Sequence, residues 1–510
     1  MTTVRLPPGP SAPRIVQGVF ALTAPRRRMR RLRARYGDAF TINVPIFGRA
    51  AVICNPAEIK QLFTAGPDVV ENLQPNLGRV LGPGSLFALT GDEHRGQRRL
   101  LTPPFHGRRL AAYERIIEEE TVRELASWPE DRPFATLPSM MRITINAILR
   151  TVFTGGGANG DVAAGSLGVD LARLRELLPQ AVTLGSRLLM LPVPQVDLGW
   201  WSPWGRFWAM RREYDAIVER LLAAAARDEK LDERDDVLAL LLRSRYDDGS
   251  PMRHSDIADQ LATLLAAGHE TTATTLAWAV ERLRRHPGVL RDLVAEMDAG
   301  GGALRAATIV EVQRTRPVIG LVGRHVKVDG YRLGRWTLPK GATVLAGISL
   351  LHADEAVFPD AGAFDPYRFL DTQPDLHEWV PFGGGTRRCL GAAFANMELN
   401  VVLRTMLRDF TLIPTTERDE RWHFRGVAYA PAKGGRAVVR RRATRPGMAD
   451  GAHMRAPQAR AARWTERGTS EGSARPERAE ACAGDTSTAT SGATTATGGT
   501  TNSIRATTTP

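Results

Sequence analysis

Apolar residues recur at intervals of three and four positions along much of the chain, a spacing that places them on one face of an α-helix. This pattern predicts helices over 108–128, 140–153, 207–228, 235–245, 255–285 and 390–407. Short, partly alternating runs bounded by Gly, Pro or Asp predict strands over 39–44, 50–54, 325–328 and 342–346. The helix over 255–285 is expected to begin at an N-cap, Ser255. The predicted fold class is therefore mainly α with a small β region.

Two glycine-rich segments, 155–168 and 298–303, are predicted to be loops that join helices within one domain. After position 442 the chain becomes rich in Thr, Ala, Gly, Ser and Arg, and such a composition offers little to bury. We therefore predict a single large domain over 1–442 and a disordered tail over 443–510.

The length and net charge of the chain limit the kinds of cofactor and macromolecule that it is expected to bind. A chain of 510 residues can enclose a bulky cofactor. Its net charge of +13 comes largely from arginines that are scattered along the chain rather than gathered in one block. Because no finger, helix-turn-helix or base-stacking signature accompanies this charge, nucleic acid is not the predicted partner. An acidic protein, or a cofactor that carries carboxylates, is favoured.

The cysteines and the N-terminal region indicate where the protein works. Cys54, Cys389 and Cys482 are widely separated and odd in number, which argues against a disulfide framework and for a reducing cytoplasm. The apolar stretch over 15–24 is about half of the roughly 20 residues that a membrane-spanning helix needs. No transmembrane segment is predicted.

Cys389 lies in the most informative segment, FGGGTRRCLGAAFANMELNVVL over 382–403. The segment reads as a glycine-rich loop that leads into a helix, and a thiolate at a helix N-terminus is stabilised by the helix dipole and backbone N–H groups. A lone cysteine is more often a small buried hydrophobic residue. Zinc or an iron–sulfur cluster would require more cysteines or histidines nearby, whereas a haem requires only one thiolate.

The predicted helix over 255–285 carries the segment LLAAGHETTATTLAW at its centre. About thirty residues of helix would extend roughly 45 Å. Ala267 and Gly268 leave a stretch without large side chains, and Glu270 and Thr271 then place a carboxyl beside a hydroxyl. Gly and Thr are unfavourable within a helix, so a functional reason is indicated, although a close helix crossing would also explain small residues.

The segment around Cys389 resembles the haem loop F-x-x-G-x-R-x-C-x-G of the cytochrome P-450 monooxygenases. It matches that pattern at each fixed position, namely Phe382, Gly385, Arg387, Cys389 and Gly391. The resemblance, which extends from about Pro7 to Arg442, implies the cytochrome P-450 fold of one haem-enclosing domain. It also implies haem b (iron protoporphyrin IX) as cofactor, with Cys389 as the axial iron ligand.

A second segment, 267–272, is similar to the family's A-G-x-[DE]-T-[TS] segment. This similarity implies that Ala267 and Gly268 lie beside the haem. It implies that Thr271 donates a hydrogen bond to the oxygen being activated and that Glu270 relays protons from solvent.

Three residues resemble the family's structural network. Glu311 and Arg314 match its E-x-x-R pair, and Arg368 matches the arginine of its P-x-R-F element. Without the resemblance, a pair three residues apart would be an ordinary helical ion pair.

Four cationic or basic residues resemble the family's partners of the haem carboxylates. His94 and Arg98 form an H-x-x-x-R pattern, one helical turn apart. Arg324 and Arg387 match two further positions at which the family places partners of the haem carboxylates. Taken singly, any of these arginines could be a solvated surface charge.

Substrate selection in the family depends on variable loops, which correspond here to 69–89 and 177–208. The second segment is apolar and aromatic, as in a lid over a lipophilic pocket or a patch in peripheral contact with a membrane, although a packed helix pair would look the same. The stretch 318–322 is expected to help line the pocket. The predicted substrate is therefore a small lipophilic molecule.

The chain has no flavin or nicotinamide fingerprint, so electrons are expected from a ferredoxin or similar protein with its reductase. Such an acidic carrier could dock on a basic face formed by Arg99, Arg108, Arg109 and Arg388. Two alternatives stay open beside the use of dioxygen. A peroxygenase would share the fold, but those relatives have Arg-Pro where this chain has Glu270 and Thr271. A haem-binding sensor without turnover would not need a proton relay.

Overall fold

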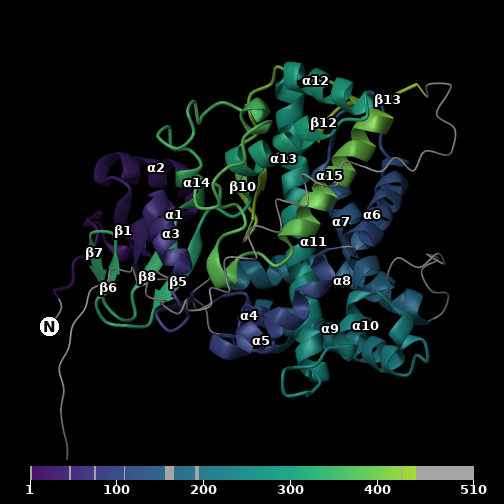
Figure 1. Ribbon diagram of the computed structural model, residues 1–510, viewed down its shortest axis with the longest axis horizontal. Helices are drawn as coiled ribbons and strands as arrows, with labels where there is room; N and C mark the ends of the chain where they lie inside the picture. Colours follow the sequence, from purple (N-terminus) through teal and green to yellow (C-terminus); the bar gives the residue numbers. More distant parts are fainter. Residues whose placement is uncertain are drawn as a thin grey trace, which may run out of the picture. The chain divides into compact units, whose positions relative to one another are not determined.

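Helices make up most of the computed structural model (Figure 1), which describes residues 3–443 except 24, 45–47, 74–75, 108, 155–165, 190–194 and 427. The described residues all belong to one of the two compact units of the chain, Met1–Gly468. The helices are α1 (Arg14–Thr23), α2 (Pro25–Tyr36), α3 (Pro56–Thr64), α4 (Gly78–Leu81), α5 (Gly91–Leu101), α6 (Arg109–Leu125), α7 (Leu137–Phe153), α8 (Ser166–Leu189), α9 (Pro203–Ala226), α10 (Val237–Arg243), α11 (His254–Arg285), α12 (Pro287–Asp298), α13 (Ala303–Thr315), α14 (Ile348–Leu351) and α15 (Ala392–Asp409).

The strands are short. The main sheet has the order β1-β2-β8-β5-β3, in which β2 and β8 are parallel and the other pairs are antiparallel. Its strands are β1 (Ala39–Val44), β2 (Gly48–Ile53), β3 (Val70–Asn72), β5 (Val322–Val326) and β8 (Thr343–Ala346). Small two-stranded pairs are formed by β4 (Phe134–Ala135), β6 (Tyr331–Leu333), β7 (Trp336–Leu338), β9 (Phe410–Leu412), β10 (Trp422–Phe424), β11 (Tyr429–Pro431), β12 (Arg436–Ala437) and β13 (Val439–Arg441).

The predicted fold class, mainly α with a small β region, is confirmed, and each of the predicted helices and strands corresponds to an observed element. Several boundaries were wrong by a few residues. Helix α11 begins at His254 with Arg253 as its N-cap, so Ser255 lies inside the helix and caps nothing. The loop predicted over 298–303 separates α12 from α13. Most of the loop predicted over 155–168 lies outside the described residues, as do Cys482 and the tail predicted over 443–510 apart from its first residue.

Local chemistry explains where several helices begin. Ser202 caps α9 by accepting a hydrogen bond from the Gly205 N–H at 2.9 Å, and Pro203 occupies the first position of that helix. Asp236 caps α10 in the same way, through the Ala239 N–H at 3.0 Å. The apolar pattern did not predict α8, which contains Pro179 in its interior, a residue that normally interrupts a helix.

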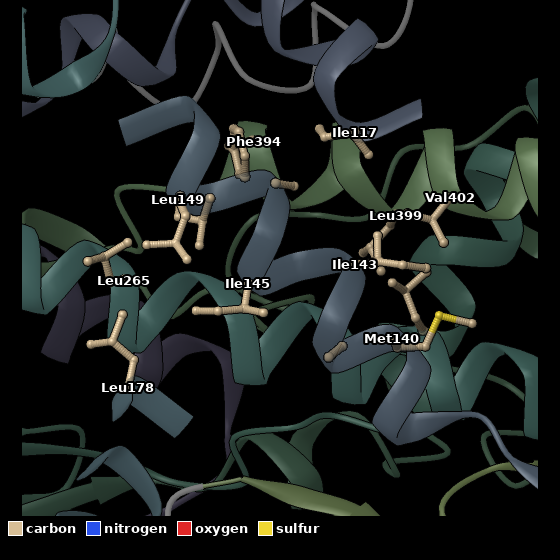
Figure 2. Close-up of a cluster of buried hydrophobic side chains, with 14 of the residues drawn as sticks. Ile117, Met140, Ile143, Ile145, Leu149, Leu178, Leu265, Phe394, Leu399 and Val402 are labelled. Carbon is tan, nitrogen blue, oxygen red and sulfur yellow. The ribbon is translucent and has the colours of Figure 1, made fainter. Parts of the chain in front are cut away.

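Helix α11 is the central element of the core. It extends for 32 residues and packs against α7, α8, α9, α13 and α15. Figure 2 shows part of the apolar cluster between these helices, where fully or almost fully buried side chains from α7, α11 and α15 meet: Met140, Ile143, Ile145, Leu149, Leu265, Leu399 and Val402. Among the described helices, none combines the length and hydrophobicity needed to cross a bilayer.

Candidate functional site

The cysteine loop precedes α15 and has a tightly determined backbone. The Cys389 N–H donates to the Phe382 carbonyl at 2.9 Å, and the Arg388 N–H donates to the Gly385 carbonyl at 3.0 Å. Gly385 has φ +66°, and a Cβ placed there would lie 1.9 Å from the carbonyl oxygen of Phe63 on α3. Only glycine fits this position, because both its left-handed backbone and its contact with α3 exclude a side chain.

The sulfur of Cys389 lies just before the N-terminus of α15. Burial raises the pKa of its thiol, and the Gly391 N–H together with the charges of Arg388 and Arg98 opposes this rise. Yet the residue is also solvent-accessible. A group that is surrounded by protein on most sides and still accessible is open on one side, so there is room beside Cys389 for another group.

The middle of α11 has a similar opening. Ala267 is exposed and Gly268 and Thr271 are partly exposed, although α11 residues on either side, such as Leu265 and Ala273, have no exposed surface. The Thr271 hydroxyl donates to the Ala267 carbonyl at 2.9 Å. This segment is thus an accessible patch, without large side chains and bearing one hydroxyl, on an otherwise buried helix.

Glu270 is buried and its carboxylate is engaged in an ion pair. Its carboxylate accepts a hydrogen bond from Arg425 Nε at 3.0 Å, and the side chains of the two residues are 9% and 29% exposed. Arg425 directly follows β10, in the turn that leads to β11. Arg425 was not predicted as a partner of Glu270, because no local pattern links the turn to α11.

The four predicted carboxylate partners lie close enough to influence one another. Burial, together with the charges of Arg387, Arg98 and Arg324, lowers the pKa of His94 to about 3. Burial also lowers the pKa of Arg98, with contributions from Arg388 and Arg387. The structure therefore brings together residues that are far apart in the sequence into one cluster of predominantly positive charge.

Two of these cations are already engaged. Arg324 donates to the Gly384 carbonyl at 3.2 Å, and burial lowers its pKa to about 10. Arg387 donates to Glu71 at 2.5 Å and to the carbonyls of Leu86 and Leu89. Glu71 is an acid that the sequence did not identify.

Arg98 has neither an ion pair nor a side-chain hydrogen bond within the described part of the chain, although it is only partly exposed. Among the described residues, the cluster therefore contains one carboxylate, that of Glu71, and several positive charges. A partly buried guanidinium without a counter-charge is unfavourable and indicates room for an anion.

These observations allow a test of whether a haem would fit. A flat, apolar cofactor with carboxylates requires a ligand for its metal, an apolar face and cations. The accessible thiol, the patch of small residues on α11 and the cationic cluster with its unpaired arginine supply these features. The residues present therefore fit such a cofactor.

The predicted structural network is assembled in the interior. The Arg314 guanidinium makes two hydrogen bonds of 2.7 Å to Glu311, and both side chains are fully buried. Arg368 approaches Glu311 at 3.7 Å and also donates to the Pro359 carbonyl. Arg314 donates further to three backbone carbonyls of the segment before Pro366, so the pair fixes the chain that leads to the cysteine loop.

An apolar pocket lies between α4, α8, α9 and α11. Both segments predicted to select the substrate contribute to it, and the predicted stretch 318–322 does not. Its lining includes Ala266, which adjoins the accessible patch of α11. The other lining residues are Val80, Leu81, Leu177, Leu178, Ala181, Val182, Phe207, Met210, Arg211, Tyr214 and Ala262.

The polar groups of this pocket are satisfied. Arg211 pairs with Asp215 at 2.8 Å and with Asp259, and the Tyr214 hydroxyl donates to the Ala258 carbonyl at 3.1 Å. The pocket therefore presents chiefly hydrocarbon to whatever enters it.

A further buried acid, Glu398 on α15, was not identified from the sequence. It has no exposed surface, and burial raises its pKa well above the usual range, a rise that the nearby Thr272 hydroxyl opposes. Burial therefore disfavours ionisation of this carboxyl, which lies next to α11.

The predicted basic docking face is described only in part. Arg99 makes an ion pair with Asp247 at 2.6 Å, and Arg388 is partly exposed beside Cys389. Arg109 is partly exposed at the start of α6, whereas Arg108 lies outside the described residues.

The chain is similar to known proteins over most of its length. The family model described as Cytochrome P450 matches residues 7–434. The chain is 53% identical over 439 residues to a protein of Mycobacterium tuberculosis named cytochrome P450 138, an alignment that covers 86% of this chain and 97% of that one. It is 38% identical over 463 residues to cytochrome P450 135B1 of the same organism, covering 87% and 93%. Neither name states a substrate.

The fold also matches a solved structure, that of cyanobacterial CYP120A1 with bound retinoic acid. The TM-score is 0.74 at 23% identity, and the alignment covers 86% of this chain and all of the other. At this identity the likeness concerns the fold alone.

Proposed function

The chain belongs to the cytochrome P450 family, an enzyme family with a haem-thiolate cofactor, and we propose that it inserts one atom of dioxygen into a small lipophilic substrate. The observation that carries this proposal is the accessible thiol of Cys389 together with the accessible hydroxyl of Thr271. We assign 1–442 to the haem-enclosing domain and keep the disordered tail over 443–510 as a prediction.

Cys389 is the residue that would bind the haem iron, within a loop kept in shape by Phe382, Gly385 and Gly391. When bound, the haem supplies the iron centre at which dioxygen is reduced, and a thiolate ligand favours cleavage of the O–O bond. Ala267 and Gly268 leave space for the flat cofactor beside α11.

Four residues would receive the haem carboxylates. Arg98 is the favoured one, because its guanidinium has no other anionic partner among the described residues. His94 adds a hydrogen-bond donor, and Arg324 and Arg387 add both donors and positive charge. Glu71 orients Arg387 by accepting its hydrogen bond.

The proton-delivery roles are assigned to Thr271 and Glu270. The Thr271 hydroxyl donates to the Ala267 carbonyl, and rotation about its side-chain bond would turn it toward the accessible space as a donor. Glu270 would carry protons inward from solvent after it is released from Arg425, since a carboxylate held in an ion pair is a poor relay.

The pocket supports an apolar substrate. Its polar side chains are already paired, so a ligand with buried hydroxyl or amide groups in this region would lose hydrogen bonds to water without replacement. We infer that the part of the substrate between α8 and α9 is hydrocarbon. Electrons would come from a ferredoxin or a similar protein with its reductase, in the cytoplasm, and peripheral contact with a membrane through 177–208 is compatible with this assignment.

The test is the absorption spectrum of the purified protein after reduction and exposure to carbon monoxide, beside a Cys389→Ser variant. The expected result is the strongly red-shifted Soret band of a thiolate-ligated complex in the wild type and its loss in the variant. A band typical of imidazole ligation in the wild type would contradict the assignment of Cys389. Product formation supported by peroxide alone, but not by dioxygen with reductants, would favour the peroxygenase, and absence of turnover would favour a sensor.

A further inference from the structure

Arg26, in the first turn of α2, is a cation without a counter-charge. Its side chain makes neither an ion pair nor a hydrogen bond among the residues that the structure describes, although it is only partly exposed. Burial, together with the charges of Arg316 and Arg30, lowers the pKa of Arg26 to about 9, so the guanidinium stays protonated at neutral pH. A partly buried positive charge of this kind is unfavourable, and an anion beside it would relieve the repulsion.

The nearby Arg316, unlike Arg26, has a partner. Its guanidinium forms an ion pair of 2.7 Å with Asp419. Asp419 also pairs with Arg282 at 2.7 Å and approaches Arg285 at 3.7 Å. This carboxylate is therefore shared among three other arginines and does not compensate the charge of Arg26.

An aromatic ring fixes the position of Arg26. Its guanidinium carbon lies 3.4 Å from the ring centroid of Trp422 on β10. At this distance the planar group can only lie flat on the indole, because an edge-on arrangement would push one of its nitrogens into the ring. The contact uses one face of the guanidinium, whereas its N–H groups point outward in the plane of the group. The edge of the guanidinium therefore remains free to bind a planar carboxylate through two parallel hydrogen bonds.

The surroundings of this guanidinium are apolar and partly accessible. The ring of Trp422 packs against that of Tyr429 on β11, with centroids 5.9 Å apart, and Tyr429 packs against Phe424 at 5.0 Å. The Tyr429 N–H donates to the Val318 carbonyl at 2.9 Å. Phe424 is 38% exposed, and Leu321, which follows Val318 by three positions, is 37% exposed. A ligand that binds the guanidinium would thus continue over hydrocarbon surface.

The hairpin of β10 and β11 leads from this guanidinium to the accessible patch of α11. Trp422 begins β10, and Arg425, three residues further, pairs with Glu270 of α11 at 3.0 Å. Three residues of extended chain cover about 10 Å. Thr271, which is partly exposed, follows Glu270 directly. The unpaired cation and the accessible hydroxyl therefore lie near the two ends of one short strand, a separation that a linear molecule can bridge.

We propose that the substrate is a lipophilic carboxylic acid whose carboxylate binds Arg26 and whose hydrocarbon chain follows the hairpin toward Thr271. This proposal rests on the proposed function, because it names the class of substrate for the same site. The turn of the hairpin also contacts α8, since a Cβ at Gly426 would lie 2.9 Å from Ser186 Cβ, and α8 lines the apolar pocket. A free phosphate ion would match the charge but not the apolar surface around it.

The experiment is isothermal titration calorimetry of the full-length haem protein with dodecanoic, tetradecanoic and hexadecanoic acids and with their methyl esters, below the concentrations at which they form micelles. The variants are Arg26→Gln, which removes the charge, and Arg26→Lys, which keeps it. Arg27→Gln removes the charge of a neighbouring exposed arginine and is the matched control. The carbon monoxide spectrum and circular dichroism verify that each variant keeps its haem and fold. Since calorimetry requires no turnover, failure of the proposed function would appear in the spectrum and failure of this proposal in the affinities.

We expect at least one acid to bind the wild type more tightly than its methyl ester. Arg26→Gln should weaken binding of the acid by about ten- to a hundredfold and leave that of the ester nearly unchanged, since the ester has no charge to lose. Arg26→Lys should keep much of the preference for the acid, and Arg27→Gln should keep all of it.

Four results would overturn the proposal. The first is that no acid binds the wild type more tightly than its ester, and the second is that Arg26→Gln weakens acid and ester alike, as a general distortion of the fold would. The third is that Arg27→Gln weakens the acid as much as Arg26→Gln does. The fourth is that inorganic phosphate displaces the acid at equal concentration, which would identify a site for simple anions.

Discussion

The carboxylate of Glu270 in α11 and the guanidinium of Arg425 in the β10–β11 turn form an ion pair of 3.0 Å beside the accessible patch of α11. The carboxylate to which we assign proton relay is therefore restrained by a residue outside α11. Movement of the hairpin would release it, so under this proposal the hairpin would affect proton delivery without contacting the substrate.

The first prediction concerns this pair. Glu270→Gln keeps the size of the side chain but cannot carry a proton, so product formation should fall by about 100-fold while the carbon monoxide spectrum is unchanged. Arg425→Gln should alter the rate only when Glu270 is present, which a double-mutant cycle with steady-state turnover measures. If the effects of the two substitutions simply add, the pair does not act as a unit.

The second prediction concerns Thr271. Replacement with Ala removes the hydroxyl that now bonds to Ala267, so reductant should still be consumed while less of it appears as product. Thr271→Ser should restore most of the coupling because it restores the hydroxyl. The measurement is the ratio of product formed to NADPH consumed with a surrogate ferredoxin and reductase. An unchanged ratio in Thr271→Ala would remove this residue from the mechanism.

The third prediction concerns the unpaired cation Arg98. If its guanidinium receives a haem carboxylate, Arg98→Ala should speed the transfer of haem to an acceptor apoprotein by about ten- to a hundredfold, the worth of one charge-assisted hydrogen bond. Arg99→Ala, whose arginine already pairs with Asp247, provides the control and should not change the rate.

The fourth prediction is a pH dependence of stability. Burial, together with the charge of Arg314, lowers the pKa of His352 to about 3 from its ordinary 6.5, and its Nε2 accepts the Val380 N–H at 3.0 Å. Between these pH values the unfolded chain binds a proton at His352 that the folded chain does not, so stability is lost as the pH falls through this window.

The variant His352→Gln keeps a hydrogen-bond acceptor that does not titrate. Urea unfolding from pH 7 downward should therefore show a shallower loss of stability in this variant than in the wild type. His254→Gln, which changes an exposed histidine, is the control. Parallel curves for the wild type and His352→Gln would contradict the prediction.

The parts of the site that could be predicted are those encoded locally. The cysteine loop and the centre of α11 are continuous segments, and their residue types and spacing are visible in the chain itself. The partners of these residues were missed because folding brings them from far away: Arg425 is 155 positions from Glu270, and Glu71 is 316 positions from Arg387.

The same distinction applies to the elements of the fold. Helix α11 was predicted almost to its ends, because its apolar pattern is long and Pro287 follows it. Helix α8 was missed, because Pro179 predicts an interruption of the helix. Tertiary packing overrides this unfavourable effect in the folded protein. Helix α2, which has seven arginines in twelve residues, has no apolar stripe of the usual width to reveal it.

The attachments of the cysteine loop bear on how the protein fails when it is heated. Although the loop precedes α15, its contacts are with the sheet region. Gly385 packs against Phe63 on α3, and Arg324 of β5 donates a hydrogen bond to the Gly384 carbonyl. Melting of the sheet region would free the thiol while the helical core around α11 is still intact. Thermal inactivation should thus begin as release of the prosthetic group, ahead of the loss of helix, and the working lifetime of the enzyme would be governed by its smaller β region.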